Sequence, residues 1–141
     1  MTKPLYTREI LQAAMALADY PFDTAMPRKV EMRSKTCGSV VWISLSVDQE
    51  KRISDIGVKA QACALGQASA AVLTRHIKGR SRSEIDAAGQ ALSDYLHGKI
   101  GRPGTWPEAD MLMSAHDYPA RRDSVLLPWR AALAAMDEGK G

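Results

Sequence analysis

Two cysteines are the residues of this sequence best suited to covalent or metal chemistry, and both lie at predicted ends of secondary structure. Cys37 opens a Cys-Gly-Ser turn, and Cys63 precedes a run of small residues that is typical of a helix. The thiolate form of cysteine is a strong nucleophile and a ligand for soft metal ions. The chemistry of the chain therefore depends on what surrounds Cys37 and Cys63.

The stretch 63–79 predicts a helix that begins directly after the second thiol. Its apolar residues fall near one helical stripe, and they are Leu65, Ala68, Val72 and Ile77. Lys78 and Gly79 are a cation and a glycine of the kind that close a helix. The dipole at a helix N-terminus favours a thiolate, so Cys63 is either a reactive thiol or, as a lone cysteine often is, a buried core residue.

The composition is that of an ordinary soluble globular protein. Of 141 residues, 45% are hydrophobic and 25% are charged, with a net charge of +3, which suits one domain spanning residues 1–141. The basic cluster Lys78, Arg80 and Arg82 has no interleaved aromatic residues. This pattern disfavours nucleic-acid binding and leaves a solvated face or a docking patch for an acidic partner.

The sequence also bears on the compartment. No apolar run is long enough to span a membrane, and the first residues lack the apolar core of a signal peptide. We therefore expect a cytoplasmic protein without a membrane partner. In that compartment the two cysteines are thiols or ligands more often than a structural disulfide.

The elements that position these thiols follow from the hydrophobic period. A first helix starts after Thr7 and stops before Pro21. Alternating patterns then predict strands at 28–34, 40–47 and 53–60, joined by short turns. Short connections imply an antiparallel meander.

The remainder of the chain has helical spacing. After the helix at 63–79, a capping box at Ser81 and Glu84 predicts a helix that ends at Gly98. A short helix is expected at 106–113. Pro128 is best tolerated near a first turn, so the last helix is expected to start near Ser124. The fold class is α+β, a three-stranded antiparallel sheet with helices packed on one face. In such a meander, Cys37 and Cys63 lie at the same end of the sheet.

Several motifs around these ends match a known pattern. Cys37-Gly38-Ser39 lies in the first turn, and a helix of small residues from Cys63 through Ser69 ends in Lys-Gly. Later in the chain, Pro119 and Arg121 form a Pro-x-Arg motif, and Trp129 follows eight residues after Arg121. With these motifs, almost the whole chain resembles the U-type iron–sulfur cluster assembly scaffolds, the group of the NifU N-terminal domain, IscU and SufU.

The chain departs from that family at positions that matter for ligation. The resemblance implies three cysteine ligands and an aspartate, but Ser124 stands at the third cysteine and Ser39 at the aspartate. Ala62 stands where a glycine is usual. By resemblance, Cys37, Cys63 and Ser124 form the cofactor-binding set, and Cys37, Cys63, Ser39 and Asp123 are the candidate metal ligands.

The resemblance implies a scaffold, not an enzyme, that binds iron or an iron–sulfur cluster, with zinc able to take its place. It implies a cysteine desulfurase as sulfur donor and iron–sulfur recipient proteins as partners. Two alternatives remain open: a degenerate member that acts as a binding or regulatory module or as a sulfur carrier, and a sulfurtransferase-like enzyme with a persulfide on Cys63. Two chains meeting as a homodimer would supply four thiolates.

Overall fold

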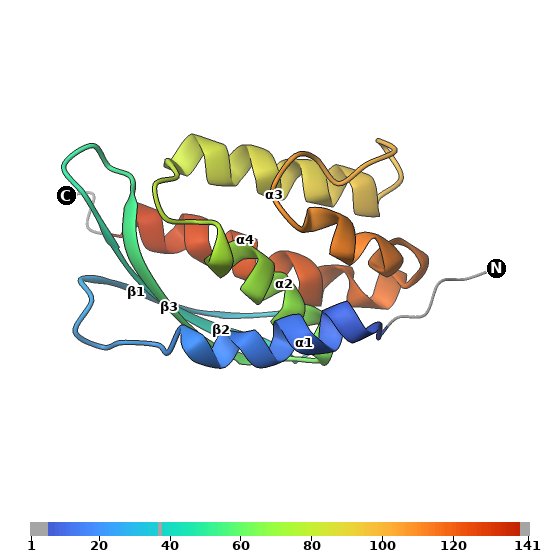
Figure 1. The fold of residues 1–141 in the computed structure, drawn as a ribbon, viewed down its shortest axis with the longest axis horizontal. Coiled ribbons are helices and arrows are strands. Elements are labelled where there is room, and N and C mark those ends of the chain that lie inside the picture. The colour runs from blue at the N-terminus through green and yellow to red at the C-terminus, as the bar shows by residue number, and fades with distance from the viewer. Residues whose placement is uncertain (1–5, 37, 139–141) are drawn as a thin grey trace.

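The computed structural model describes residues 6–36 and 38–138, and its centre is a three-stranded antiparallel sheet. The strands are β1 (Arg28–Arg33), β2 (Val40–Val47) and β3 (Ile53–Gln61), in the order β1-β2-β3. In Figure 1 the strands run through the left and lower part of the molecule, behind the helix drawn in blue, and the other helices lie above them. The predicted meander and its three strands are confirmed.

Alternation along β2 explains which face of the sheet is covered. Val41, Ile43 and Leu45 point to the helices and are buried. On the opposite face, the Trp42 indole N–H donates to Glu31 at 2.6 Å, and the Lys59 ammonium lies 4.9 Å from the Trp42 ring centroid. This polar and aromatic pairing across three strands is what a solvated sheet face accommodates.

The loop after the first helix crosses the edge strand β3 at Gly57. Residue Val58 donates its backbone N–H to the Tyr20 carbonyl at 2.7 Å, and the Asp23 N–H donates to Ser44 Oγ at 2.9 Å. A Cβ at Gly57 would lie 2.2 Å from the Pro21 carbonyl oxygen. Position 57 therefore requires glycine, because the loop backbone occupies the space of a side chain.

The helices pack in a layer on the buried sheet face. They are α1 (Arg8–Ala16), α2 (Ala64–Arg75), α3 (Arg82–Leu96) and α4 (Arg122–Asp137). Helix α4 contacts β1 and β2, and α2 contacts β3 and α4. Helix α2 thus contacts both α4 and α1, and α3 packs on α4 (Figure 1). The predicted α+β class is confirmed.

Local signals fix several helix ends as expected. The Thr7 hydroxyl accepts the Ile10 N–H at 3.2 Å and caps α1. A short 3₁₀ turn, η1 (Leu17–Asp19), then ends before Pro21. Ser81 and Glu84 form the predicted capping box of α3. Gly98 follows α3 with φ +76°, a left-handed conformation that suits glycine.

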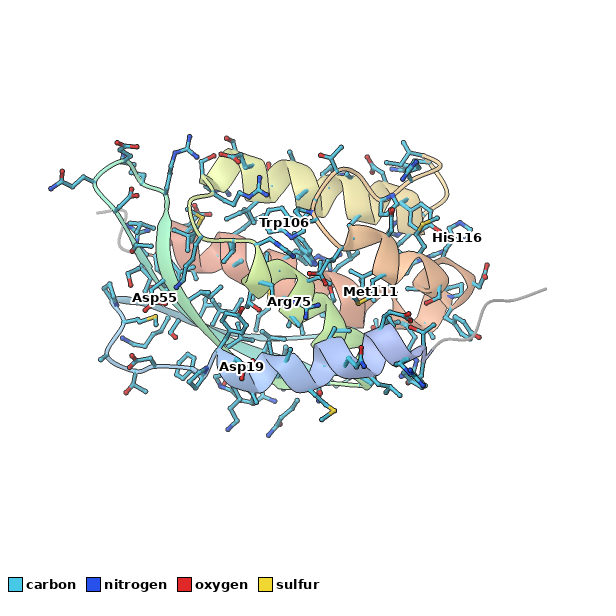
Figure 2. All side chains as sticks on the ribbon, viewed as in Figure 1. Asp19, Asp55, Arg75, Trp106, Met111 and His116 are labelled. Atoms are coloured by element: carbon cyan, nitrogen blue, oxygen red, sulfur yellow. The ribbon has the colours of Figure 1, made fainter. Side chains whose placement is uncertain are left out.

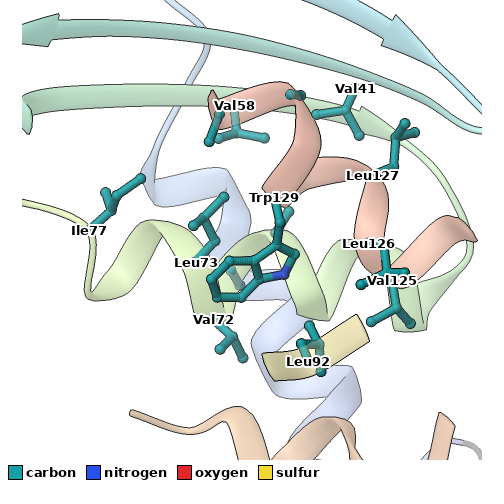
Figure 3. Packing of buried hydrophobic residues seen from close by; sticks show 14 of the residues in the cluster. Val41, Val58, Val72, Leu73, Ile77, Leu92, Val125, Leu126, Leu127 and Trp129 are labelled. Carbon is teal, nitrogen blue, oxygen red and sulfur yellow. The ribbon is translucent and has the colours of Figure 1, made fainter. Parts of the chain in front are cut away.

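The core is built around two tryptophans that face each other. The rings of Trp106 and Trp129 meet edge to face, with centroids 5.1 Å apart. Figure 3 shows Trp129 among Val72, Leu73 and Leu92, which come from α2 and α3. Trp106 lies between α2 and α3 in Figure 2, and its indole N–H donates to the Val72 carbonyl at 2.9 Å.

The predicted end of α2 at Lys78 and Gly79 was wrong. The helix ends at Arg75, and His76 is its C-cap. Buried Ile77 continues the apolar pattern beyond the helix because it lies in a turn against the core. Gly79, with φ +85°, donates its N–H to the Ile53 carbonyl at 2.8 Å and so joins this turn to the start of β3.

Two other predicted boundaries also moved. The short helix expected at 106–113 is a 3₁₀ helix, η2 (Ala109–Asp117), which starts after Glu108 in a left-handed conformation at φ +67°. Helix α4 starts at Arg122, after the turn η3 (Pro119–Arg121), and Pro128 lies inside it. Pro128 has no N–H to donate to the Ser124 carbonyl four residues earlier, so α4 lacks one backbone hydrogen bond there.

Candidate functional site

Cys63 is the N-cap residue of α2. Its backbone is extended, at φ −62° and ψ 165°, and its carbonyl accepts the Gln67 N–H at 3.0 Å. The half-buried thiol packs against the edge of the core and is not in a disulfide. The strand-to-helix junction predicted for Cys63 is therefore what the fold provides, and it leaves the thiol partly accessible.

The thiol faces a serine from the other end of the chain. Ser124, in the first turn of α4, places its Oγ 3.5 Å from the Cys63 Sγ. The Ser39 Oγ lies 3.5 Å from the Ser124 Oγ, and both serines are buried. Three distant segments thus bring Cys63, Ser124 and Ser39 together, as the sequence pattern predicted for these three.

Two small residues of α2 bring α4 close enough for this contact. A Cβ at Gly66 would lie 2.3 Å from the Ser124 Oγ and 3.3 Å from the Ser124 carbonyl oxygen. One turn later, the buried Ser69 hydroxyl donates to the Val125 carbonyl at 2.6 Å and accepts from the Trp129 indole N–H at 2.9 Å. Gly66 permits the approach, and Ser69 bonds the two helices at that distance.

Asp123, the carboxylate proposed as an additional ligand, bonds elsewhere. Its Oδ2 accepts from the Thr36 hydroxyl at 2.8 Å and the Ser34 hydroxyl at 3.4 Å. Its Oδ1 lies 3.5 Å from the Arg130 guanidinium. The Thr36 hydrogen bond, followed by the charge of Arg130, lowers the pKa of Asp123. Neither oxygen has a described hydrogen bond to Cys63 or Ser124.

The donors in the described part of the chain do not make a complete metal site. Within residues 6–36 and 38–138, no three His, Cys, Asp or Glu side chains are grouped so that they hold a metal ion. The contacts around Cys63 are hydroxyls, and a serine hydroxyl is a poor donor to zinc or iron beside a thiolate. Cys37, the other predicted thiol, lies outside the described residues.

Sequence reasoning missed the polar residues that hold Asp123 and the close approach at Gly66. Ser34 and Thr36 follow β1 as an unremarkable polar turn, and nothing in their spacing indicates a partner 87 positions away. Gly66 carried a usable signal, because glycine in a helix is costly and is retained where another backbone comes near.

Within the described residues, no helix combines the length and apolar character needed to cross a membrane.

Comparison with known proteins gives three informative similarities. The chain is 27% identical to the iron–sulfur cluster assembly scaffold protein IscU of Streptococcus pyogenes serotype M1, over 76% of this chain and 67% of that protein. It is 25% identical to the zinc-dependent sulfurtransferase SufU of Bacillus subtilis (strain 168), over 79% of this chain and 76% of that protein.

The fold has a solved counterpart as well. The crystal structure of a nitrogen-fixing NifU-like protein (N-terminal) from Brucella abortus superposes with a TM-score of 0.85. It is 28% identical, and the match covers 97% of this chain and 96% of that one.

The model of the NifU-like N terminal domain matches residues 18–116. Cys63 and Ser39 lie inside that match, whereas Ser124 lies beyond it, on a helix that the fold nonetheless brings to Cys63. The match covers well over half of the sequence, and the predicted resemblance is confirmed: the chain belongs to the NifU-like N-terminal domain family.

Proposed function

We propose that this protein acts in iron–sulfur cluster assembly as a scaffold-type protein. The observation that carries the proposal is the meeting of Cys63, Ser124 and Ser39 at 3.5 Å contacts in a chain of this family. The names of its relatives, an IscU scaffold and a SufU sulfurtransferase, agree with this role. In it, sulfur and iron are cargo rather than a resident cofactor.

Cys63 is the residue that we propose receives sulfur from a cysteine desulfurase. Its thiolate attacks the terminal sulfur of the donor's persulfide, so that the donor's S–S bond breaks, a new S–S bond forms at Cys63, and the donor leaves as a thiolate. The incomplete burial of Cys63 supports this, because a partner's persulfide must reach the sulfur atom.

We propose that Cys37 and Cys63 would hold iron or a cluster, with Ser39, Ser124 and Asp123 as candidate oxygen donors. Replacement of a thiolate by Ser124 weakens such a set, since zinc and iron–sulfur clusters favour four soft donors. Asp123 already accepts hydrogen bonds from Ser34 and Thr36. We therefore propose weak metal binding by one chain, strengthened where two chains pair and double the thiolates.

A second function is favoured by that incomplete donor set. A member that carries sulfur on Cys63 and passes it to an iron–sulfur recipient needs one accessible thiol and no metal. In both roles we propose a single domain over residues 1–141, in the cytoplasm, that moves cargo without being an enzyme. The relative in Bacillus subtilis is named a zinc-dependent sulfurtransferase, so transfer of sulfur to and from Cys63 is the activity to measure.

The decisive experiment separates the two roles. Protein purified without oxygen is analysed for iron, zinc and acid-labile sulfide, and is then incubated with a cysteine desulfurase and cysteine. Mass spectrometry under non-reducing conditions shows whether one sulfur atom is added at Cys63, with Cys63→Ser and Cys37→Ser as matched controls. Bound iron with sulfide supports the scaffold, sulfur on Cys63 without metal supports the carrier, and neither refutes both.

A further inference from the structure

A second polar cluster lies beside the Cys63 site, where the end of α3, the start of α4 and the turn after β1 meet. It lines a pocket of about 330 Å³. Its charged and polar side chains are Thr36, His97, Arg122, Asp123 and Arg130. Pro119, Ala120 and Leu126 form an apolar wall of the same pocket.

The charges of this pocket do not cancel. Asp123 and Arg130 are 3.5 Å apart and neutralise each other, and Asp123 also accepts the Thr36 hydroxyl. The Arg122 side chain has no ion pair or hydrogen bond to the described residues, and its Nε is buried without an acceptor. A buried N–H with no acceptor is costly, and the positive charge of Arg122 is likewise unmatched by any described carboxylate.

His97, another residue of the pocket lining, also has a ring nitrogen without a described hydrogen-bond partner. The His97 Nδ1 lies 2.8 Å from the Ser93 carbonyl oxygen, which only accepts, so Nδ1 is the donor of that bond. The His97 Nε2 has no described partner. The backbone N–H of Arg122 donates to the Pro119 carbonyl and is therefore not free to bind a ligand.

We propose that this pocket binds the carboxylate group of a small organic acid or of an acidic side chain, with Arg122 as its main ligand. The guanidinium groups of Arg122 and Arg130 and the carboxylate of Asp123 together leave a net charge of one positive unit. That charge matches the single negative charge of a carboxylate ligand. A phosphate monoester carries about 1.5 to 2 negative charges at neutral pH, which exceeds the single positive charge of the pocket. The guanidinium fork suits the two oxygens of a carboxylate, and the apolar wall suits a short carbon chain.

The test is a titration of the full chain followed by NMR at constant ionic strength. The probes are propionate, a blocked glutamate peptide, and inorganic phosphate. Saturation with propionate identifies a free acid as a ligand, and saturation with the peptide alone identifies a partner's side chain. Arg122→Gln should weaken the binding by about tenfold or more, since it removes a charge-assisted hydrogen bond.

The matched control is Arg121→Gln, which removes the same charge one residue away, outside the pocket lining. It should leave the affinity nearly unchanged, as should Cys63→Ser, so the result does not depend on the sulfur chemistry proposed above. Equal weakening by both arginine variants would mean a nonspecific charge effect and would overturn the proposal. So would tighter binding of phosphate than of propionate, or no saturation with any probe.

Discussion

The Ser124 Oγ lies 3.5 Å from the Cys63 Sγ across 61 positions of sequence. This contact joins the first turns of α2 and α4, and it depends on the Gly66 and Ser69 face of α2 rather than on either residue of the pair. The geometry of the site is therefore a property of one helix–helix contact, and changes along that contact are expected to reach the thiol.

Adding a methyl group at Gly66 tests this directly. In Gly66→Ala the new Cβ lies 2.3 Å from the Ser124 Oγ and 3.3 Å from the Ser124 carbonyl oxygen, so the Ser124 side chain must turn or α4 must shift. We expect a loss of about 1–3 kcal/mol in unfolding free energy and a changed alkylation rate at Cys63.

The control for this change is Gly89→Ala in α3, whose Cβ meets Trp129 no closer than 3.4 Å. That variant should be neutral or gain up to about 1 kcal/mol, because alanine is the better helix former. Denaturant unfolding of both variants provides the comparison. Equal stability of Gly66→Ala and the parent would show that α2 and α4 are not in close contact at Ser124.

Removing the Ser69 hydroxyl tests the second part of the contact. Ser69→Ala leaves the buried Trp129 indole N–H without its acceptor, so unfolding free energy should fall by about 1–3 kcal/mol. Thr74→Val is the control, since the buried Thr74 hydroxyl bonds only the Ala71 carbonyl of its own helix. It should cost less than Ser69→Ala, and the reverse order would contradict the assigned role of Ser69.

Restoring the family's ligand pattern should create metal affinity. In Ser124→Cys with Ser39→Asp, a thiolate and a carboxylate replace hydroxyls beside Cys63, so zinc should bind clearly more tightly than in the parent. Competition against a chromophoric chelator measures it. Ser93→Cys, which adds a thiol on α3 away from the site, is the control. Equal affinity of parent and double variant would show that these positions do not share one metal ion.

Acid stability should depend on Glu84, the acidic member of the α3 capping box. A hydrogen bond from Arg52, at 2.7 Å, and then the Ser81 backbone N–H lower the pKa of Glu84 from 4.5 to about 2. A carboxyl with a lowered pKa stabilises the fold above its unfolded pKa, and this contribution is lost as the pH falls from 4.5 through about 2.

Urea unfolding measured from about pH 6 down to about pH 2 follows this loss of stability. Glu84→Gln should flatten the decline in stability, and Arg52→Gln should flatten it too, since Arg52 is the main cause of the shift. A parent-like decline in Glu84→Gln would assign acid sensitivity to other carboxyls.

Local patterns were sufficient for most of the fold. The alternation in β2, the Thr7 cap and the Ser81 capping box each depend on residues a few positions apart, and each prediction was confirmed. Helix α4 starts at Arg122, two residues before Ser124, the start that was expected because Pro128 is best tolerated in or near the first turn of a helix. The tertiary contacts of α4, including the Ser69 bond to Val125, stabilise a helix that contains an internal proline.

The site was only partly predictable for the same reason. Element order brought Ser39, Cys63 and Ser124 to one end of the sheet. The direction of the Asp123 side chain, however, depends on hydrogen bonds to Ser34 and Thr36 across the fold, which no local pattern encodes. The predicted approach of Cys37 to Cys63 remains a prediction, since Cys37 lies outside the described residues.

The cover that α4 provides over β1 and β2 has a consequence for synthesis on the ribosome. Val41, Ile43 and Leu45 are translated long before residues 122–137 emerge to bury them. Until then an apolar sheet face is open, and such a face favours binding by chaperones and aggregation. The contact between Cys63 and Ser124 also forms only after α4 has emerged, because Ser124 lies in the first turn of that helix.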